Sequence, residues 1–187
     1  FDLGTGAGGW GNNELQTYVQ DNTNIALNGE GHLVITAREN AEGEYTSARI
    51  RTTDKVEFQR GRFTARIKLP SGQGLWPAFW MLGSSFSTIG WPTCGEIDIL
   101  ELRGSQPQNL LGTLHGPGYS GAEGVGSHYT AASALSEDFH VYAVERSEDR
   151  IRWYLDDILF SEKTPSDLTP GTDDHPGRLR PVDGRLL

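Results

Sequence analysis

Apolar and polar residues alternate along most of this chain, and this period of two limits what it can fold into. In residues 61–70, GRFTARIKLP, the odd-numbered positions from 63 to 69 hold Phe, Ala, Ile and Leu, and the even-numbered positions from 62 to 68 are polar. Successive side chains of a β-strand point to opposite faces, so this segment has one apolar face. The pattern predicts an antiparallel strand with one buried and one solvated face.

The same pattern predicts six further strands and one hairpin. The strands are 32–38, 45–52, 76–82, 96–102, 110–116 and 139–147, and the hairpin covers 150–162, turning at Asp156-Asp157. No amphipathic helix is predicted. Short strands at this density, divided by turns rich in Gly and Asn, favour a two-sheet antiparallel β-sandwich or a barrel.

Length and charge restrict the class of protein and its partners. The chain has 187 residues, which fits one domain with a sizeable core, and 36% of them are hydrophobic. No apolar run approaches the ~20 residues of a membrane-spanning helix, so no membrane association is expected. The formal net charge of -9 argues against nucleic acid or anionic lipid as a partner. A neutral substrate needs no electrostatic steering and is compatible with this charge.

The single cysteine, Cys94, excludes an intrachain disulfide. A cytoplasmic protein and a secreted domain with a self-sufficient core are both compatible with this. The sequence starts at Phe1 without Met or a signal peptide, which we interpret as a mature product, an expressed segment or a fragment.

Three acidic residues lie among apolar neighbours in the segment CGEIDILEL. In a regular strand, Glu96 and Asp98 share a face and Glu101 lies on the opposite one. One extra residue, a β-bulge at Ile99 or Leu100, would return Glu101 to the face of the other two acids. The backbones of Glu96 and Glu101 would then be about 13 Å apart, which is four strand steps of ~3.3 Å.

Acids at this separation suit glycoside hydrolysis. Two glutamates that lean toward each other could approach the ~5–5.5 Å carboxyl separation of a retaining glycosidase. Asp98, between them, could hold a proton and push their pKa values apart. Solvent-facing acids on an edge strand, or calcium ligands, explain the spacing equally well.

Three tryptophans, Trp76, Trp80 and Trp91, precede the acids within twenty residues. Trp76 and Trp80 have equal parity and can share a face of their strand. The C–H-rich faces of pyranose rings pack on indole, so flat rings beside carboxylates favour a sugar-binding surface. Each ring taken alone is more often a core residue. The combination of rings and acids favours a carbohydrate-active protein.

Five motifs in a fixed order extend this argument: GWGNNELQTY, YTSARI, GRFTARIKLPSGQGLWPAFWML, GWPTCGEIDILE and GTLHGPGYSG. Together they resemble the laminarinase branch of glycoside hydrolase family 16, over a match from Phe1 to about Phe160. The resemblance implies an all-β jelly roll, which is a two-sheet antiparallel sandwich, and endo-β-1,3-glucanase activity. The extra residue in EIDILE is similar to the bulged form of laminarinases, which lichenases and xyloglucan transglycosylases typically lack.

The resemblance also implies roles for individual residues. Glu96 would be the nucleophile and Glu101 the general acid/base, with Asp98 assisting. Six residues would contact substrate: Trp76, Trp80, Trp91, Arg62, Asn13 and His115. In this set the tryptophans would form sugar subsites, Arg62 and Asn13 would bind glucose hydroxyls, and the histidine would lie near the acid/base on the leaving-group side.

Simpler interpretations stay open for three residues of this set. Arg62 would be a charge on an edge strand, Asn13 a turn residue and His115 a packed histidine.

The ends of the chain depart from the family pattern. We divide the sequence into a glucanase-like sandwich, 1–171, and an atypical C-terminal tail, 172–187. The tail has no alternating apolar face, so we expect its arginines (178, 180 and 185) to be exposed and the tail to form no strand of the central sheets. The fold is therefore expected to lack some strands of the family.

The resemblance also sets expectations for ligands and location. No cofactor and no metal in the site are expected to be required, and the family's frequent calcium site, near the chain ends, is not expected here. The expected partner is β-1,3-glucan, as polysaccharide or oligosaccharide. We expect a monomer, unless another chain pairs with an exposed sheet edge, and a secreted, extracellular protein that degrades polysaccharide.

The leading hypothesis is a retaining endo-β-1,3-glucanase that acts by double displacement. The alternatives are a non-catalytic β-1,3-glucan-binding sandwich and a sister specificity such as mixed-linkage β-1,3-1,4-glucan. Binders of this family usually lose the catalytic glutamates, whereas both glutamates are present here.

Overall fold

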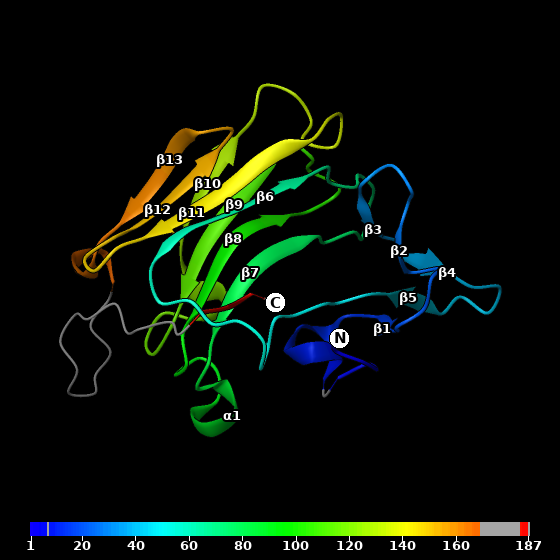
Figure 1. Ribbon diagram of the computed structural model, residues 1–187, viewed down its shortest axis with the longest axis horizontal. Helices are drawn as coiled ribbons and strands as arrows, with labels where there is room; N and C mark the ends of the chain where they lie inside the picture. Colours follow the sequence, from blue (N-terminus) through cyan, green and yellow to red (C-terminus); the bar gives the residue numbers. More distant parts are fainter. Residues whose placement is uncertain (7, 169–183, 187) are drawn as a thin grey trace. The chain divides into compact units, whose positions relative to one another are not determined.

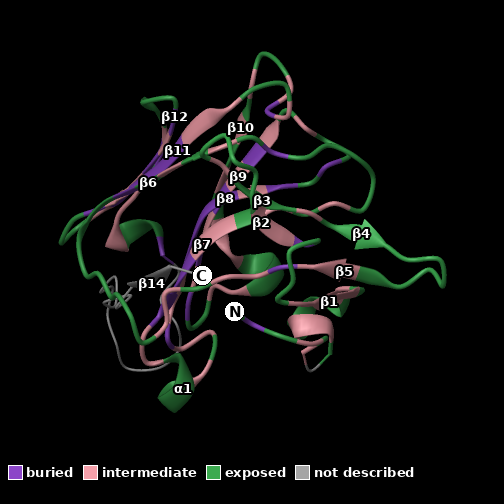
Figure 2. Cartoon of the chain, turned by 45° about the vertical axis from the view of Figure 1, so that its right-hand side comes forward, coloured by how far each residue is buried: buried purple, intermediate pink, exposed green. Residues whose placement is uncertain are grey.

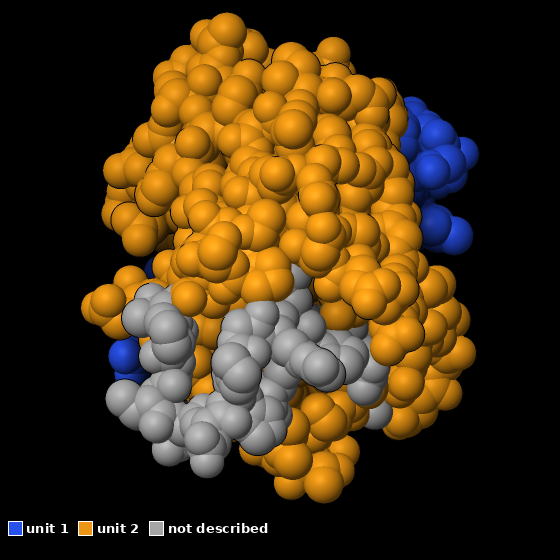
Figure 3. Space-filling model, turned by 90° about the vertical axis from the view of Figure 1, so that its left-hand side faces the viewer, with its two compact units in different colours: residues 1–51 blue, residues 52–187 orange. Residues whose placement is uncertain are grey.

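The structure, a computed structural model, describes residues 1–6, 8–168 and 184–186, the last three by their backbone alone. It divides into two compact units, residues 1–51 and residues 52–187, which Figure 3 colours separately. Each unit is described by itself. None of the helices in the described part of the chain has the length and apolar character of a membrane-spanning segment.

The second unit contains two antiparallel sheets (Figure 1). The five-stranded sheet has the order β10-β9-β8-β7-β14, formed by β7 (Ala78–Gly83), β8 (Glu96–Leu102), β9 (Asn109–His115), β10 (Val125–Thr130) and β14 (Gly184–Leu186). The four-stranded sheet has the order β13-β12-β11-β6, formed by β6 (Gly61–Ile67), β11 (His140–Arg146), β12 (Ile151–Leu155) and β13 (Ile158–Lys163). Three short helices connect these strands: α1 (Phe86–Ile89), η2 (Gly121–Glu123) and η3 (Pro165–Asp167).

The core lies between these two sheets. Figure 2 shows buried residues running along β8, β9 and β11, and the inward side chains of both sheets form one cluster, which includes Phe63, Met81, Ile97, Leu110, Val144 and Trp153. Burying a large apolar side chain stabilises a fold by about 1.5–3 kcal/mol relative to leaving it exposed. The predicted two-sheet antiparallel sandwich is therefore confirmed, and the period of two is its cause.

The first unit contains two small sheets. One has the order β1-β5-β4, formed by β1 (Gln16–Tyr18), β5 (Tyr45–Ser47) and β4 (Arg38–Glu39), with β1 parallel to β5. The other is a hairpin of β2 (Ile25–Leu27) and β3 (Leu33–Ile35). A π-helical turn, η1 (Gly9–Asn13), precedes β1. The buried Asp2 carboxylate binds Arg49 at 2.9 Å and Arg51 at 2.8 Å.

The predicted strands agree with the structure best in the second unit. The predicted strand 32–38 is divided into β3 and β4, and the strand predicted over 45–52 ends at Ser47. The short strands β1, β2 and β10 were not predicted. Strands β1 and β2 have only three residues each, and β10 contains a glycine and several polar residues, so none of the three shows enough alternation. The hairpin turn is confirmed: Asp156 and Asp157 have φ angles of 48° and 64° between β12 and β13.

The prediction that residues 172–187 form no strand of the central sheets is wrong for residues 184–186. These residues form β14, which pairs antiparallel with β7. A three-residue edge strand needs only main-chain partners, which the edge of β7 supplies, and therefore needs no alternating apolar pattern. The rest of the predicted tail, with Arg178 and Arg180, and the side chain of Arg185 lie outside the described residues.

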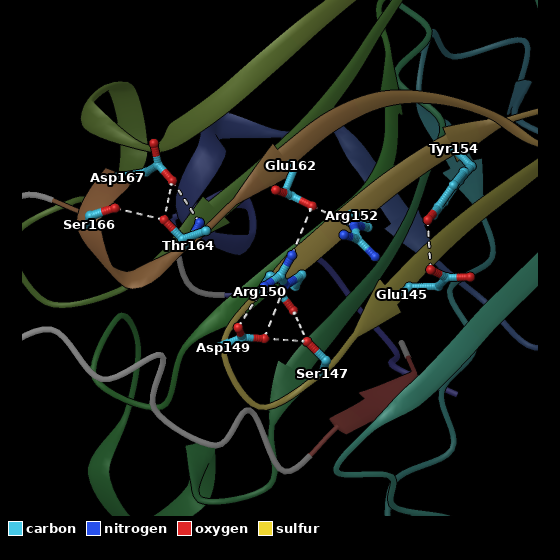
Figure 4. Close-up of polar contacts among 10 residues, drawn as sticks. All are labelled: Glu145, Ser147, Asp149, Arg150, Arg152, Tyr154, Glu162, Thr164, Ser166 and Asp167. Carbon is cyan, nitrogen blue, oxygen red and sulfur yellow. Dashed lines mark hydrogen bonds and ion pairs between the residues drawn. The ribbon is translucent and has the colours of Figure 1, made fainter.

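The outward face of the four-stranded sheet carries a network of charged and hydroxyl groups (Figure 4). The guanidinium of Arg152 lies 2.5 Å from Glu162, Arg150 lies 2.7 Å from Asp149, and the Tyr154 hydroxyl donates to Glu145 at 2.6 Å. At the end of β13, the Thr164 hydroxyl donates to Asp167 and caps η3. Exposed ion pairs contribute about 0–1 kcal/mol each, so this face is polar without holding the fold together.

The hairpin turn yields a paired prediction. Asp157 is in the left-handed region, which costs a non-glycine residue roughly 1 kcal/mol, and its exposed ion pair with Arg62 offsets only part of that cost. Asp157→Gly should therefore raise the free energy of unfolding by about 0.5 kcal/mol. Asp156→Gly should lower it by about 1–2 kcal/mol, because Asp156 accepts the Val141 N–H at 2.8 Å. Urea unfolding measures both, and equal stability of the two variants would contradict this account.

Candidate active site

A β-bulge in β8 brings the three acids to one face of the five-stranded sheet. Between the pairs Asp98–Thr113 and Glu101–Leu111, β8 has two residues where β9 has only Gly112. Against β7, Asp98 pairs with Trp80 and Leu100 pairs with Phe79, so Ile99 is the extra residue. The predicted bulge is confirmed. We call the outward face of this sheet, which carries Glu96, Asp98, Glu101 and His115, the acidic face.

Each glutamate accepts a hydrogen bond from a tryptophan. The indole Nε1 of Trp91 donates to Glu96 Oε2 at 2.5 Å, and that of Trp76 donates to Glu101 Oε1 at 3.0 Å. Trp91 and Trp76 are 45% and 50% exposed as residues, so each offers apolar surface beside a carboxylate. The indole N–H groups orient the acids while their rings stay available to a ligand.

Asp98 lies between the glutamates and contacts His115. Asp98 is only 3% exposed, and its Oδ2 lies 3.1 Å from Nε2 of His115. His115 pairs with Glu96 across β8 and β9, and its ring lies 6.0 Å from that of Trp91. The half-buried Trp80 pairs with Asp98 from β7, which places it on the acidic face as well.

Burial raises the pKa of each acid, because the charged form loses its hydration. For Glu96, burial and then the Asp98 charge raise the pKa to about 8. For Asp98, burial and then the Glu101 charge raise the pKa well above its ordinary value. Burial also raises the pKa of Glu101, against the Trp76 hydrogen bond and nearby positive charges.

The three acids therefore share protons at neutral pH. Asp98 is the least exposed of the three acids, and its burial is the first reason why its charged form is disfavoured. Beyond burial, the Asp98 charge and a hydrogen bond to Asp98 both raise the pKa of Glu96, so the proton between these two carboxyls is favoured on Glu96. Each charge in this group disfavours the charge of its neighbour, so the three acids do not all ionise together, which suits acid–base chemistry that needs a proton donor beside an ionised carboxylate.

Glu96, Asp98 and His115 are also close enough to hold a cation, since one ligand atom of each lies within 4.8 Å of the others. Proton sharing accounts for the same closeness without a bound ion. The expectation of a metal-free site stays a prediction.

One residue of the predicted substrate-binding set, Arg62, is not brought to the acids within the second unit. Arg62 precedes the buried Phe63 on β6, so it lies on the outward face of the four-stranded sheet, where it binds Glu145 at 2.9 Å. The core separates that face from the acidic face, which corrects the predicted role of Arg62 in favour of an edge-strand charge. Asn13 ends η1 in the first unit with a φ of 56°, and its role stays a prediction.

Sequence reasoning missed two residues beside the acids. A Cβ added at Gly124 would lie 2.5 Å from Cε1 of His115, so a glycine here makes room for the imidazole. The positive charge of Arg103 lowers the pKa of Glu101. Its position two residues after Glu101 was a usable signal, whereas nothing in the sequence marks Gly124.

The family model for glycosyl hydrolases family 16 matches residues 11–181. This chain belongs to that family. The family resemblance drawn from the sequence motifs is therefore confirmed. The bulged acidic strand and its flanking tryptophans lie within the matched range.

Individual relatives give the same result. The chain is 43% identical over 170 residues to a glucan endo-1,3-beta-glucosidase of Cryptopygus antarcticus and 44% identical over 166 residues to a beta-glucanase of Rhodothermus marinus. Each match covers 86% of this chain, which spans 61% and 58% of the two relatives. The solved laminarinase of Rhodothermus marinus is 40% identical in sequence and superposes with a TM-score of 0.85. The match covers 99% of this chain and 75% of the laminarinase chain.

The charge of Asp98 gives a prediction about its neighbour. Asp98→Asn removes a negative charge that raises the Glu96 pKa, and an amide N–H can donate to the Glu96 carboxylate. Both effects lower the pKa of Glu96, so we expect a downward shift of at least about one unit. Carbon-13 NMR titration of the glutamate carboxyls measures it, with the exposed Asp138→Asn as control. An unchanged or higher Glu96 pKa would show that Asp98 does not act on Glu96 through charge.

Proposed function

We propose that this chain is a retaining endo-β-1,3-glucanase, a laminarinase, that cleaves internal β-1,3-glucosidic bonds by double displacement. The observation that carries the proposal is the bulge, which brings Glu96 and Glu101 to one face with Asp98 between them. The solved laminarinase with the same fold and the curated glucanases support the choice of substrate.

In the first step, protonated Glu101 donates its proton to the glycosidic oxygen while the ionised Glu96 attacks the anomeric carbon. The bond to the leaving sugar breaks and a glycosyl ester of Glu96 forms. In the second step, Glu101 takes a proton from water, which attacks the anomeric carbon and releases Glu96. Two inversions at one carbon give net retention.

The remaining residues of the acidic face would bind and orient sugar. The exposed rings of Trp76 and Trp91 flank the two glutamates and offer stacking surfaces for glucose, and Trp80 lies opposite Asp98. His115, in contact with Asp98, would help to keep the central carboxyl in place. We further propose that the protein is secreted, because its proposed polymeric substrate does not cross membranes.

The deciding experiment measures reducing-sugar release from laminarin beside pull-down on insoluble β-1,3-glucan. Release with retained anomeric configuration supports the proposal. Binding without release favours a glucan-binding sandwich, and faster release from mixed-linkage β-glucan favours the sister specificity.

Glu96→Gln should lower turnover of laminarin by about 10³-fold or more while leaving glucan binding nearly intact. A carboxamide keeps the shape of the side chain but cannot attack the anomeric carbon. The matched control is Glu42→Gln, an exposed glutamate of the first unit, which should behave as the parent. Turnover within tenfold of the parent would remove Glu96 from the nucleophile role.

Glu101→Ala should lower laminarin hydrolysis by about 10²–10⁴-fold and affect an activated aryl β-glucoside of laminaribiose less. A good leaving group needs no proton, so the first step survives while the second slows. Added azide should restore turnover and yield a β-glycosyl azide, which chromatography and NMR identify. An α-azide, or no rescue with any substrate, would count against Glu101 as acid/base.

A further inference from the structure

Trp153, on β12 of the four-stranded sheet, reaches across the core to the bulge in the five-stranded sheet. The residue is 1% exposed, and its indole Nε1 donates to the main-chain oxygen of Asp98 at 2.8 Å. Asp98 is the last residue before the bulge. The hydrogen bond thus ties the start of the bulge to the opposite sheet, while the Asp98 side chain lies on the acidic face.

The indole ring also lies against Gly112, the single β9 residue opposite the bulge. A Cβ added at Gly112 would lie 2.6 Å from Cδ1 and 2.8 Å from Nε1 of Trp153. These distances are far shorter than a van der Waals contact, so only a glycine leaves room for the ring at this position. The ring therefore contacts both strands that the bulge misaligns.

A second hydrogen bond joins the sheets at the same level. On β13, Ser161 is the ladder partner of Trp153, and on β10, Ser127 is the ladder partner of Gly112. The two hydroxyls are 2.7 Å apart. The pairing of β12 with β13 also shifts register directly after Trp153. Irregularities of both sheets thus meet at one level of the core, where polar links cross between them.

We propose that Trp153 is a positioning residue, whose hydrogen bond to Asp98 and contact with Gly112 hold the bulge in the register that keeps Glu101 beside the other acids. In a regular ladder, a one-residue slip turns every following side chain to the other face. Glu101 would then point into the apolar core. The kinetic consequence rests on the proposed glucanase function, whereas the structural consequence does not.

The simpler interpretation is that Trp153 fills the core and its N–H takes the nearest acceptor. On that interpretation, loss of the N–H lowers stability and leaves the acids unchanged. On ours, loss of the N–H changes the acids themselves.

The test compares Trp153→Phe with Tyr142→Phe. Tyr142 is 0% exposed in the same core, and within the described residues its hydroxyl has no hydrogen-bond partner, so this control removes a buried polar group without touching the bulge. Trp153→Phe should lower kcat on laminarin by at least about tenfold with KM nearly unchanged, and shift the pH–rate profile. The control should keep the kcat and profile of the parent.

A second substitution guards against a variant that fails to fold. Incorporation of 3-benzothienylalanine at position 153 replaces the indole N–H by sulfur and keeps both fused rings. It should shift the Glu96 and Glu101 titrations in carbon-13 NMR, a readout that needs no activity. If the folded variants keep the parent's carboxyl titrations and kcat, the proposal is overturned and Trp153 is a core residue only. If the folded parent does not cleave laminarin, the proposed function fails while the titrations still decide the role of Trp153.

Discussion

The structure of the site depends on the parity of one strand. β8 lies in the interior of the five-stranded sheet, with its inward side chains in the core and its outward side chains on the acidic face. Without the extra residue Ile99, the apolar Leu102 and the acid Glu101 would exchange faces, and the core would gain a carboxylate. The same single residue therefore satisfies the core and assembles the acids. Burial of Leu100 and Leu102 stabilises the bulge, in addition to any ladder hydrogen bond.

The tryptophans have two distinct relations to this strand. Trp76 and Trp91 approach it from the outward face and bind the carboxyl groups through their indole N–H. Trp153 approaches it from the core and binds its main chain. The side chains and the backbone of the same segment are thus fixed from opposite sides, which is the preorganisation that a two-carboxylate mechanism requires.

Much of this could be predicted from the sequence, and the limits have physical causes. Alternation along the strands predicted an antiparallel sandwich or barrel and the spacing of Glu101 suggested the bulge, because each is a local property of the chain, and the family resemblance then chose the sandwich and the bulged form. The family resemblance, which the comparisons confirm, gave the proposed roles of the acids. The resemblance assigned Arg62 to the substrate, whereas Arg62 lies on the outward face of the four-stranded sheet, because alternation gives the face of a strand but not which sheet the strand joins. Strand β14 and Gly124 depend on contacts between distant segments, and local patterns carry no record of such contacts.

The raised pKa of Glu96 also couples the site to the stability of the fold. The folded chain holds a proton at this carboxyl up to a pH of about 8, whereas an unfolded glutamate releases it near pH 4.3. The resulting contribution to stability is fully present below the lower value and is lost as the pH rises through the higher one. The ionised nucleophile is therefore the form that the fold tolerates least. Whenever the pH is high enough to ionise Glu96, the remaining contacts of the sandwich must therefore offset the cost of burying that charge.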